Sequence, residues 1–200
     1  RLFKDMHYGQ HIDNFTSSEG YYDCSGGRNI SILCNDNATF LEYSFQEQLL
    51  FDDDSRLVKV NLATEFSADL YGTTLGALTR RFVLLFAEGN SETFDVVEHL
   101  HQGTFADERS LMIALNEFER TQLSQGYLGI SMIEQSGLAE MQEATNLDDL
   151  LLDLSDDIRA VDMYVYEDER GAWLEAGFYL PGKDRDRVMN QAEQAPTEDF

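Results

Sequence analysis

The two cysteines, Cys24 and Cys34, are the residues whose spacing points most directly to a covalent bond. Strand-like residues lie at 21–23 and 30–33, and the residues at 25–29 between them, Ser-Gly-Gly-Arg-Asn, are rich in turn formers. A hairpin of this kind brings the two Cβ atoms within bonding reach. We therefore expect a Cys24–Cys34 disulfide, with two unrelated thiols as the alternative. Two thiolates without a neighbouring Cys or His make only half a zinc site, so we expect no metal there.

Four histidines are the next candidates for metal binding or proton transfer. His7 and His11 would share a face if residues 2–11 form a short helix, which the sequence allows. No HExxH motif accompanies them, and we interpret them as exposed side chains near the start of the chain. His99 and His101 are two residues apart and would point in different directions on a helix. The sequence therefore predicts no metal ligand and no cofactor.

Carboxylates gather at two places. Residues 52–54 are three consecutive aspartates, but they lack the alternate ligand positions, central Gly and closing Glu of a calcium loop, so we interpret them as an acidic turn. The second group lies on the outer face of a helix expected from Asn146, where like charges one turn apart do not stabilise the helix. Either a basic partner docks there or the face is simply solvated. This acidic face consists of Asp148, Asp149, Asp153, Asp156 and Asp157.

The overall charge excludes some partners. The chain carries 38 acidic and 14 basic residues among its 200, a formal charge of -24. Such a chain repels DNA and anionic membranes at long range. Only three of the basic residues are lysines, and a hydrated acidic surface with little Lys suggests adaptation to salt, where screening relieves self-repulsion. The acidity can reflect habitat or a specific ligand, and both interpretations stay open.

The usual signatures of enzymes are absent from the sequence. It contains no Gly-x-Ser-x-Gly elbow, no phosphate-binding GxxxxGK[ST] loop, no GxGxxG after a strand and no CxxC. A hydrolase or metal-dependent enzyme would still be conceivable if the fold made a concave pocket that gathers His99 or His101 with carboxylates. We favour a role without catalysis.

The elements that must position these residues begin with strands. Residues 41–51 alternate apolar and polar side chains, residues 52–55 form a turn, and residues 57–63 resume the alternation. Together with the two strands around the cysteines, they predict an antiparallel β-meander over about residues 21–64. Residues 82–87 are apolar and can form either a short buried strand or the end of a helix.

Helices are expected after the meander. Ser67, Ser91 and Thr104 can cap the starts of three helices, the last through a capping box with Asp107. The second helix should stop at Gly103. The second and third helices would then form an αα-hairpin.

The C-terminal part returns to strands. Residues 127–133 are almost continuously apolar, as in a strand covered on both faces. A leucine-striped helix is expected from Asn146 to Ile158, followed by a hairpin over residues 163–180. The fold class is therefore α+β: a meander, then helices, with a C-terminal helix and hairpin that complete the same sheet or form a second one.

The domain organisation follows from length and composition. A chain of 200 residues can bury one core, so we expect a single domain over residues 1–182, with two lobes at about 1–90 and 91–182 as an option, and a loosely ordered tail at 183–200. No apolar run approaches the roughly 20 residues of a membrane span. A start at Arg1 fits a removed signal peptide or anchor, and it fits a cytosolic fragment almost as well.

The function expected from these features is binding rather than catalysis. A disulfide favours a periplasmic or secreted domain that acts on a protein partner, which the acidic surface suggests is basic. In a secreted protein, Asn14, Asn29 and Asn37 head sequons that could carry glycans. The alternative from another class is a cytoplasmic DNA mimic that presents carboxylates to a nucleic-acid-binding protein.

Overall fold

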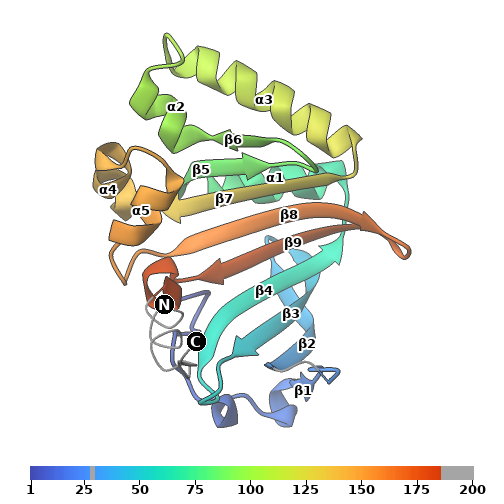
Figure 1. Ribbon diagram of the computed structural model, residues 1–200. Helices are drawn as coiled ribbons and strands as arrows, with labels where there is room; N and C mark the ends of the chain where they lie inside the picture. The colour runs from blue at the N-terminus through green and yellow to red at the C-terminus, as the bar shows by residue number, and fades with distance from the viewer. Residues whose placement is uncertain (28–29, 186–200) are drawn as a thin grey trace, which may run out of the picture.

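The computed structural model of the protein describes residues 1–27 and 30–185 (Figure 1). Within them, one antiparallel sheet contains strands in the order β1-β2-β3-β4-β9-β8-β7-β5-β6. The strands are β1 (Tyr22–Asp23), β2 (Ser31–Phe40), β3 (Tyr43–Phe51), β4 (Leu57–Glu65), β5 (Phe82–Glu88), β6 (Thr93–Asp95), β7 (Tyr127–Glu134), β8 (Ala160–Asp168) and β9 (Gly171–Tyr179).

Helices connect the strands of the second half. They are α1 (Ala68–Leu78), α2 (Val96–Gln102), α3 (Glu108–Ser124), α4 (Leu138–Glu143) and α5 (Leu147–Asp153), with 3₁₀ turns at Ile12–Asn14, Ser17–Glu19 and Gln135–Gly137. No helix of the described residues is both long enough and apolar enough to cross a membrane.

The predicted α+β fold with a β-meander is confirmed. Strands β1 to β4 follow one another as antiparallel neighbours, and the ambiguous segment at 82–87 is the strand β5. The C-terminal hairpin β8–β9 completes the same sheet, because β9 pairs with β4 and β8 pairs with β7. One sheet thus runs through both halves of the chain, and the division into two lobes stays a prediction.

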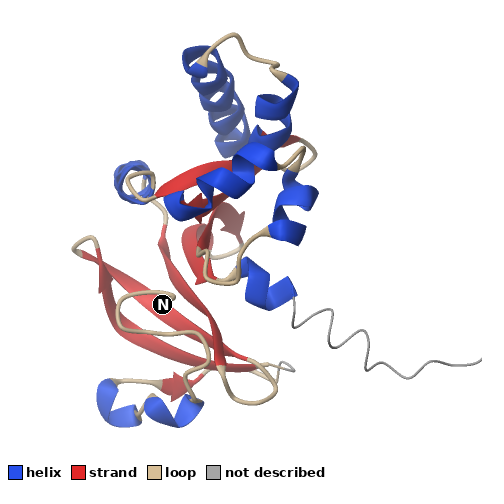
Figure 2. Ribbon diagram, turned by 90° about the vertical axis from the view of Figure 1, so that its left-hand side faces the viewer, coloured by secondary structure: helices blue, strands red, loops and turns tan. Residues whose placement is uncertain are grey.

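One face of the sheet is covered by helices and by the N-terminal loop. In Figure 1, α1 lies behind the strands, and Figure 2 shows the helices around the upper part of the sheet. The N-terminal loop lies against the meander below. Leu2 and Phe3 are buried, and the ring of Phe3 stacks on Phe178 of β9 at 4.9 Å. The opposite face of β4, β9, β8, β7 and β5 carries polar and aromatic side chains, most of them half-exposed.

This arrangement corrects two expectations. Residues 2–11 do not form a helix, because Leu2 and Phe3 are drawn into the core and Lys4 and Gly9 take positive φ angles. The strand at 127–133 is covered on both faces only at its C-terminal end. Leu128, Ile130 and Met132 are buried against the helices, whereas on the other face Tyr127 and Ser131 are half-exposed and Ile133 is buried.

Helix starts agree with the sequence only in part. The hydroxyl of Ser67 accepts a hydrogen bond from Leu70 N and caps α1 as expected. The expected cap at Ser91 is wrong, since residues 93–95 form β6 and Asp95 caps α2 instead. The expected cap at Thr104 is also wrong, because Asp107 caps α3 in a reciprocal pair with Ser110. A short strand and a nearer carboxylate supply better partners for the free backbone N–H groups.

The leucine-striped helix is shorter than predicted. α5 ends at Asp153, and Leu154 is extended and buried. The Arg185 guanidinium donates to the carbonyl oxygens of Leu151, Leu152 and Leu154 at 2.6–3.3 Å, so it satisfies groups that a longer helix would bond internally. Residues 181–185 are helical. The rest of the predicted tail, 186–200, lies outside the described residues.

The expected disulfide is present. Cys24 follows β1 directly and bonds to Cys34 of β2, with the two Cα atoms 5.9 Å apart. The backbone register places them diagonally across the strand pair, since Tyr22 lies opposite Cys34 and Cys24 N donates to Ile32 O at 3.0 Å. The bond therefore fastens the short edge strand β1 to the sheet.

Candidate functional site

A large cavity lies between the helices and the covered face of the sheet. Its volume is about 680 Å³. The walls are mostly apolar side chains from α1, β5, α2, α3, β7 and α4, including Leu75, Leu84, Ala87, Val97, Leu111, Leu115, Leu128, Ile130, Met132 and Met141. Such a volume is that of a site for a small organic ligand.

The helix α3 forms one wall of the cavity. Of its 17 residues, only Gln122 is buried. Gln122 lies in the space that a Cβ at Gly89 would fill, and its amide donates to Glu92 at 3.3 Å. This contact holds the C-terminal end of α3 on the β5–β6 turn. The apolar stripe of α3, including Leu111 and Leu115, therefore lines the cavity without filling it.

The rim of the cavity exposes apolar side chains. Leu100 of α2 is 57% exposed, Met112 of α3 is 45% exposed and Leu138 of α4 is 39% exposed, and all three belong to the cavity lining. Isolated exposed leucines are ordinary on protein surfaces. Three around one opening, from three different helices, indicate a surface that gains free energy when an apolar group covers it.

Six polar side chains belong to the lining, and the two carboxylates, Glu108 and Glu119, are its acidic groups; the others are Thr79, His101, Asn116 and Gln142. Glu119 of α3 lines the cavity, and burial raises the pKa of its carboxyl group, although the Tyr71 hydroxyl beside it lowers the pKa in part. Burial also raises the pKa of Tyr71, and Glu119 adds to this. Glu108 and His101 lie in the lining as well, and no Lys or Arg does among the described residues. An anionic ligand group would therefore meet carboxylates.

The cavity satisfies only part of what the enzyme alternative requires. The cavity does gather His101 with Glu108 and Glu119, but no hydrogen bond joins His101 to either carboxylate in the described structure. His99 packs its ring against Phe94 at 4.8 Å and approaches the Thr104 hydroxyl at 3.4 Å. The described residues contain no group of three or more His, Cys, Asp or Glu side chains that could hold a metal ion.

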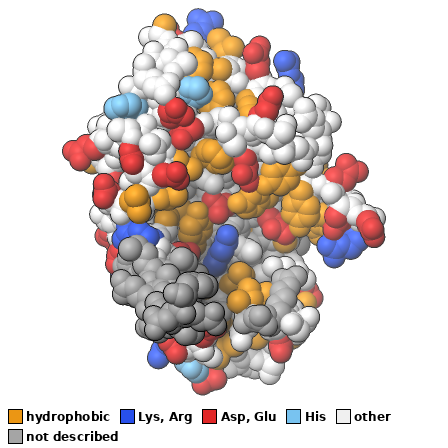
Figure 3. All heavy atoms as spheres, viewed as in Figure 1, with side chains coloured by type: hydrophobic (Ala, Val, Ile, Leu, Met, Phe, Trp, Pro, Cys, Tyr) orange, Lys and Arg blue, Asp and Glu red, His pale blue; other side chains and the backbone are white. Residues whose placement is uncertain are grey.

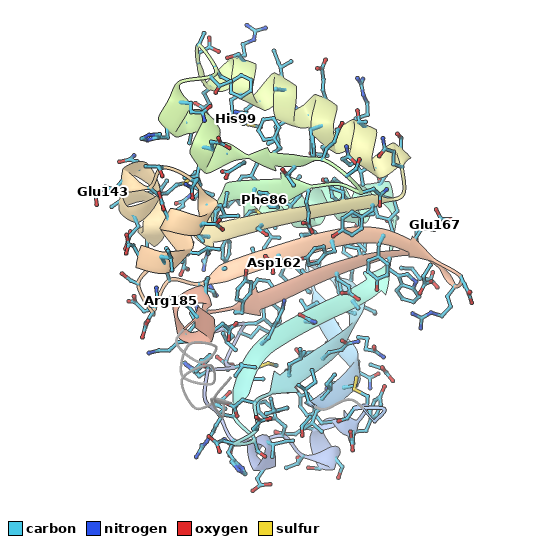
Figure 4. The ribbon with its side chains drawn as sticks, viewed as in Figure 1. Phe86, His99, Glu143, Asp162, Glu167 and Arg185 are labelled. Carbon is cyan, nitrogen blue, oxygen red and sulfur yellow. A yellow bond between two sulfur atoms is a disulfide. The ribbon has the colours of Figure 1, made fainter. Side chains whose placement is uncertain are left out.

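The uncovered face of the sheet is a second candidate site, which we call the tyrosine face. Figure 3 shows this face. Across the middle of the molecule, carboxylates alternate with side chains coloured as hydrophobic, a colour that includes tyrosine. Figure 4 places Asp162 near the centre of the sheet, with Phe86 above it and Glu167 towards the far end of β8. Strand pairing assigns to this face Glu88, Tyr127, Asp162, Tyr164, Tyr166, Trp173, Glu175 and Tyr179.

Tyrosine hydroxyls hold the carboxylates of this face. Tyr127 donates to Glu88 and Tyr166 donates to Glu175, each at 2.6 Å. In both pairs, burial raises the pKa of the tyrosine, and the bonded carboxylate raises it further. Burial and the nearby Asp162, Glu88 and Glu175 carboxylates raise the pKa of Tyr164 to about 12. These phenols therefore stay protonated at neutral pH and can donate hydrogen bonds.

Asp162 is the most buried carboxylate of the tyrosine face, with 7% of its surface exposed. It accepts hydrogen bonds from Ser131 at 2.8 Å and Tyr179 at 3.1 Å, and Lys59 approaches it at 3.6 Å. Lys59 also lies over the ring of Tyr179. Lys59 can lie flat across β9 because its side chain occupies the space beside Gly177 that a Cβ would fill.

The predicted acidic face is only partly continuous. Asp148 and Asp149 lie in the first turn of α5 and Asp153 is its last residue. Asp156 and Asp157 follow the helix, and Asp156 forms ion pairs with Lys183 and Arg185. The Asp149 carboxylate accepts a hydrogen bond from the Thr145 hydroxyl, and the Asp149 backbone N–H donates to the Asn146 side chain that caps α5. Docking of a basic partner at these five aspartates remains an untested prediction.

The histidines and sequons near the N-terminus lie apart from both sites. His7 is exposed, and His11 pairs with Asp13 at 3.1 Å. Asn14 and Asn37 are exposed, whereas Asn29 lies outside the described residues.

Comparison with known proteins gives no relative: no family model matches the chain, and no curated protein or solved structure is similar to it.

Proposed function

We propose that this protein is a non-catalytic, extracytoplasmic binding domain whose ligand is a small, uncharged apolar molecule held in the cavity. The observation that carries the proposal is the cavity itself, about 680 Å³ in volume, with apolar walls from six elements and an apolar rim. An alkyl chain or a fused-ring compound fits this chemistry. Each buried methylene group contributes about 0.8 kcal/mol to binding.

The side chains of the lining also indicate that the ligand carries no negative charge. Glu108 and Glu119 are near the bound molecule and no described cation faces them, so a fatty-acid carboxylate would be repelled. An alcohol, sterol-like or other neutral ligand avoids this repulsion. The hydroxyl of such a ligand can donate a hydrogen bond to the Glu119 carboxylate.

The compartment is inferred from the disulfide. Cys24 and Cys34 are bonded, and bonds of this kind persist in oxidising compartments and are rare in reducing cytosol. A periplasmic or secreted protein fits this best. The same observation weighs against the cytoplasmic DNA mimic, which also needs regularly spaced carboxylates that the short helix α5 does not offer.

Binding is favoured over hydrolysis because of the chemistry near His101. A hydrolase needs a nucleophile or a metal-bound water within reach of the base. His101 has neither a carboxylate partner that orients it nor a neighbouring metal cluster among the described residues.

A titration with the neutral dye Nile red, followed by displacement with dodecanol, tests the proposal. Wild-type protein should enhance the dye's fluorescence, and dodecanol should reverse the enhancement. Ile130→Trp fills the cavity from β7 and Leu115→Trp fills it from α3, and each should weaken binding about tenfold because the ligand and the indole compete for one volume. The α3 substitution is at a half-buried site, where the fold is least affected.

The matched control is Leu152→Trp. Leu152 is 62% exposed on α5 and does not line the cavity, so this variant should keep the wild-type affinity. Equal loss in all three variants, or no dye binding by the wild type, would overturn the proposal. Preference for dodecanoate over dodecanol would contradict the argument from Glu108 and Glu119.

A further inference from the structure

The tyrosine face has the composition of a protein interface. Tyrosine and tryptophan are enriched in interface centres because they bury large areas at low cost in side-chain entropy. Tyr127, Tyr164, Tyr166, Trp173 and Tyr179 come from three adjacent strands and are each half-exposed. The helices that cover the sheet lie on its other face, so this surface is separate from the cavity.

Two carboxylates of this face, Glu88 and Glu175, lack cationic partners among the described residues. Glu88 and Glu175 each accept one hydrogen bond from a neutral tyrosine, and neither forms an ion pair within the described residues. Two cations near this face already have carboxylate partners. Lys59 faces Asp162, and Arg170 is paired with Asp168 at 2.8 Å. The face therefore holds two half-buried negative charges that a positively charged partner can neutralise.

The two carboxylates are in one row across the sheet. Strand pairing places Glu88 opposite Gly129, Gly129 opposite Tyr164, and Tyr164 opposite Glu175. Three strand spacings of about 4.8 Å separate the two glutamates, roughly 14 Å in all. Four residues of an extended peptide span about the same distance. The ring of Tyr164 lies between the two glutamates, where a cation gains further from the aromatic face.

We propose that the tyrosine face docks a basic segment of a partner protein, in extended conformation, with arginine or lysine side chains over Glu88 and Glu175. Charge complementarity selects the occupant. The tyrosines supply the contact area and the two carboxylates supply the specificity for cations. Arginine suits these positions best, because it bonds carboxylates through two N–H groups and stacks on aromatic rings.

The direct experiment measures binding of a short peptide of alternating arginine and serine by fluorescence anisotropy. The peptide should bind the wild-type protein, and the double variant Glu88→Gln/Glu175→Gln should bind it about fivefold more weakly, as expected for two partly screened ion pairs. Glutamine keeps the oxygen that accepts from Tyr127 or Tyr166, so the sheet retains its hydrogen bonds.

The control separates this face from the general negative charge of the chain. Asp53→Asn/Asp54→Asn also removes two negative charges, but from the exposed turn between β3 and β4. This variant should keep a peptide affinity within twofold of the wild type. Equal loss in both double variants would overturn the proposal, as would a peptide that does not bind at all.

Chemical-shift mapping on the wild-type protein provides a measurement that no substitution can disturb. The peptide should shift the amide signals of β5, β7, β8 and β9, together with the indole signal of Trp173. Shifts confined to α5 and the turn at residues 52–54 would instead assign the partner to other carboxylates and contradict the docking site.

Discussion

Glu47 is a carboxylate buried in the core side of the meander, with 3% of its surface exposed. Its Oε1 accepts a hydrogen bond from Tyr21 at 2.7 Å. Burial raises the pKa of Glu47, and the Tyr21 hydroxyl and the charge of Lys4 only partly offset this. A carboxyl group whose pKa is raised by folding favours the folded state below its unfolded pKa, and this advantage is lost as pH rises through the folded pKa.

Glu47→Gln should therefore stabilise the protein at neutral and alkaline pH. The amide keeps an acceptor for Tyr21 and removes the buried charge, so the free energy of unfolding at about pH 8 should rise by roughly 1–2 kcal/mol. Below about pH 4, where wild-type Glu47 is protonated, the difference should vanish. Urea unfolding at several pH values measures this. The exposed Glu65→Gln is the matched control, and a gain that is equal at both pH extremes would refute the argument from Glu47.

The residue scale also shows what sequence reasoning found and missed. The Cys24–Cys34 pair could be predicted because its turn and flanking strands are local. The tyrosine face was missed, although a signal was present: Tyr164 and Tyr166 alternate with buried Met163 and Val165 along one strand. Pairing of Glu88 with Tyr127 joins residues 39 positions apart and depends on a register that no local pattern specifies.

At the scale of elements, the disulfide is the main covalent constraint on the N-terminal meander. It closes a loop over a sequence separation of 10 residues, and β1 is only two residues long. The double variant Cys24→Ser/Cys34→Ser should lose about 2–3 kcal/mol of stability in urea unfolding, mostly because the unfolded chain is freed. The purified native protein should show no free thiol in an assay without reductant. Two reactive thiols would contradict both the bond and the extracytoplasmic assignment.

The C-terminal end of α3 is in close contact with the turn between β5 and β6. A Cβ at Gly89 would lie 1.8 Å from the Gln122 Oε1 atom, so Gly89→Ala must displace the only buried side chain of α3. We expect a loss of about 1–3 kcal/mol in unfolding free energy and weaker binding of a ligand in the cavity.

Gly76→Ala is the control for this substitution. Nothing lies within 4 Å of a Cβ at Gly76, which is in α1, so alanine there should be neutral or stabilising by up to about 1 kcal/mol. If Gly89→Ala is as well tolerated as Gly76→Ala, α3 is not anchored as described.

The cavity could not be predicted from the sequence. Its walls come from residues between Leu75 and Ala144, among them the apolar stripe of α3 that includes Leu111 and Leu115. A stripe shows which side of a helix is apolar, not how far the helix stands from the sheet. The helix starts at Ser91 and Thr104 were mispredicted because a local capping pattern competes with partners supplied by β6 and by Asp107.

At the scale of the whole molecule, the large negative charge should make the protein more stable as the salt concentration rises. At a net charge of -24, repulsion between carboxylates opposes the compact state, and screening shortens from about 10 Å at 0.1 M to about 3 Å at 1 M salt. Thermal unfolding in NaCl should show a melting temperature about 3–6 °C higher at the upper concentration, equivalent to roughly 1–2 kcal/mol. Near pH 4, where carboxylates are partly protonated, the rise should shrink. A melting temperature that falls with salt would oppose the interpretation of the surface as salt-adapted.

The fold class was predictable at this scale because each strand of the meander carries its own alternation and each hairpin its own turn. Joining the C-terminal hairpin to β4 was left between two options by the sequence, and the pairing of β9 with β4 decides for a single sheet. The covered face then receives the helices and the N-terminal loop, and the cavity forms where the helices meet the sheet.

The central claim, an apolar ligand inside that cavity, is tested most directly by nuclear Overhauser effects between bound dodecanol and methyl groups of the protein. We predict cross-peaks from the alkyl protons to Val97 of α2, Leu115 of α3 and Ile130 of β7, which line the cavity from three elements. The claim would be contradicted if dodecanol gave no cross-peak to these methyl groups while Leu115 and Ile130 gave strong ones to each other, since α3 would then be packed directly on the sheet.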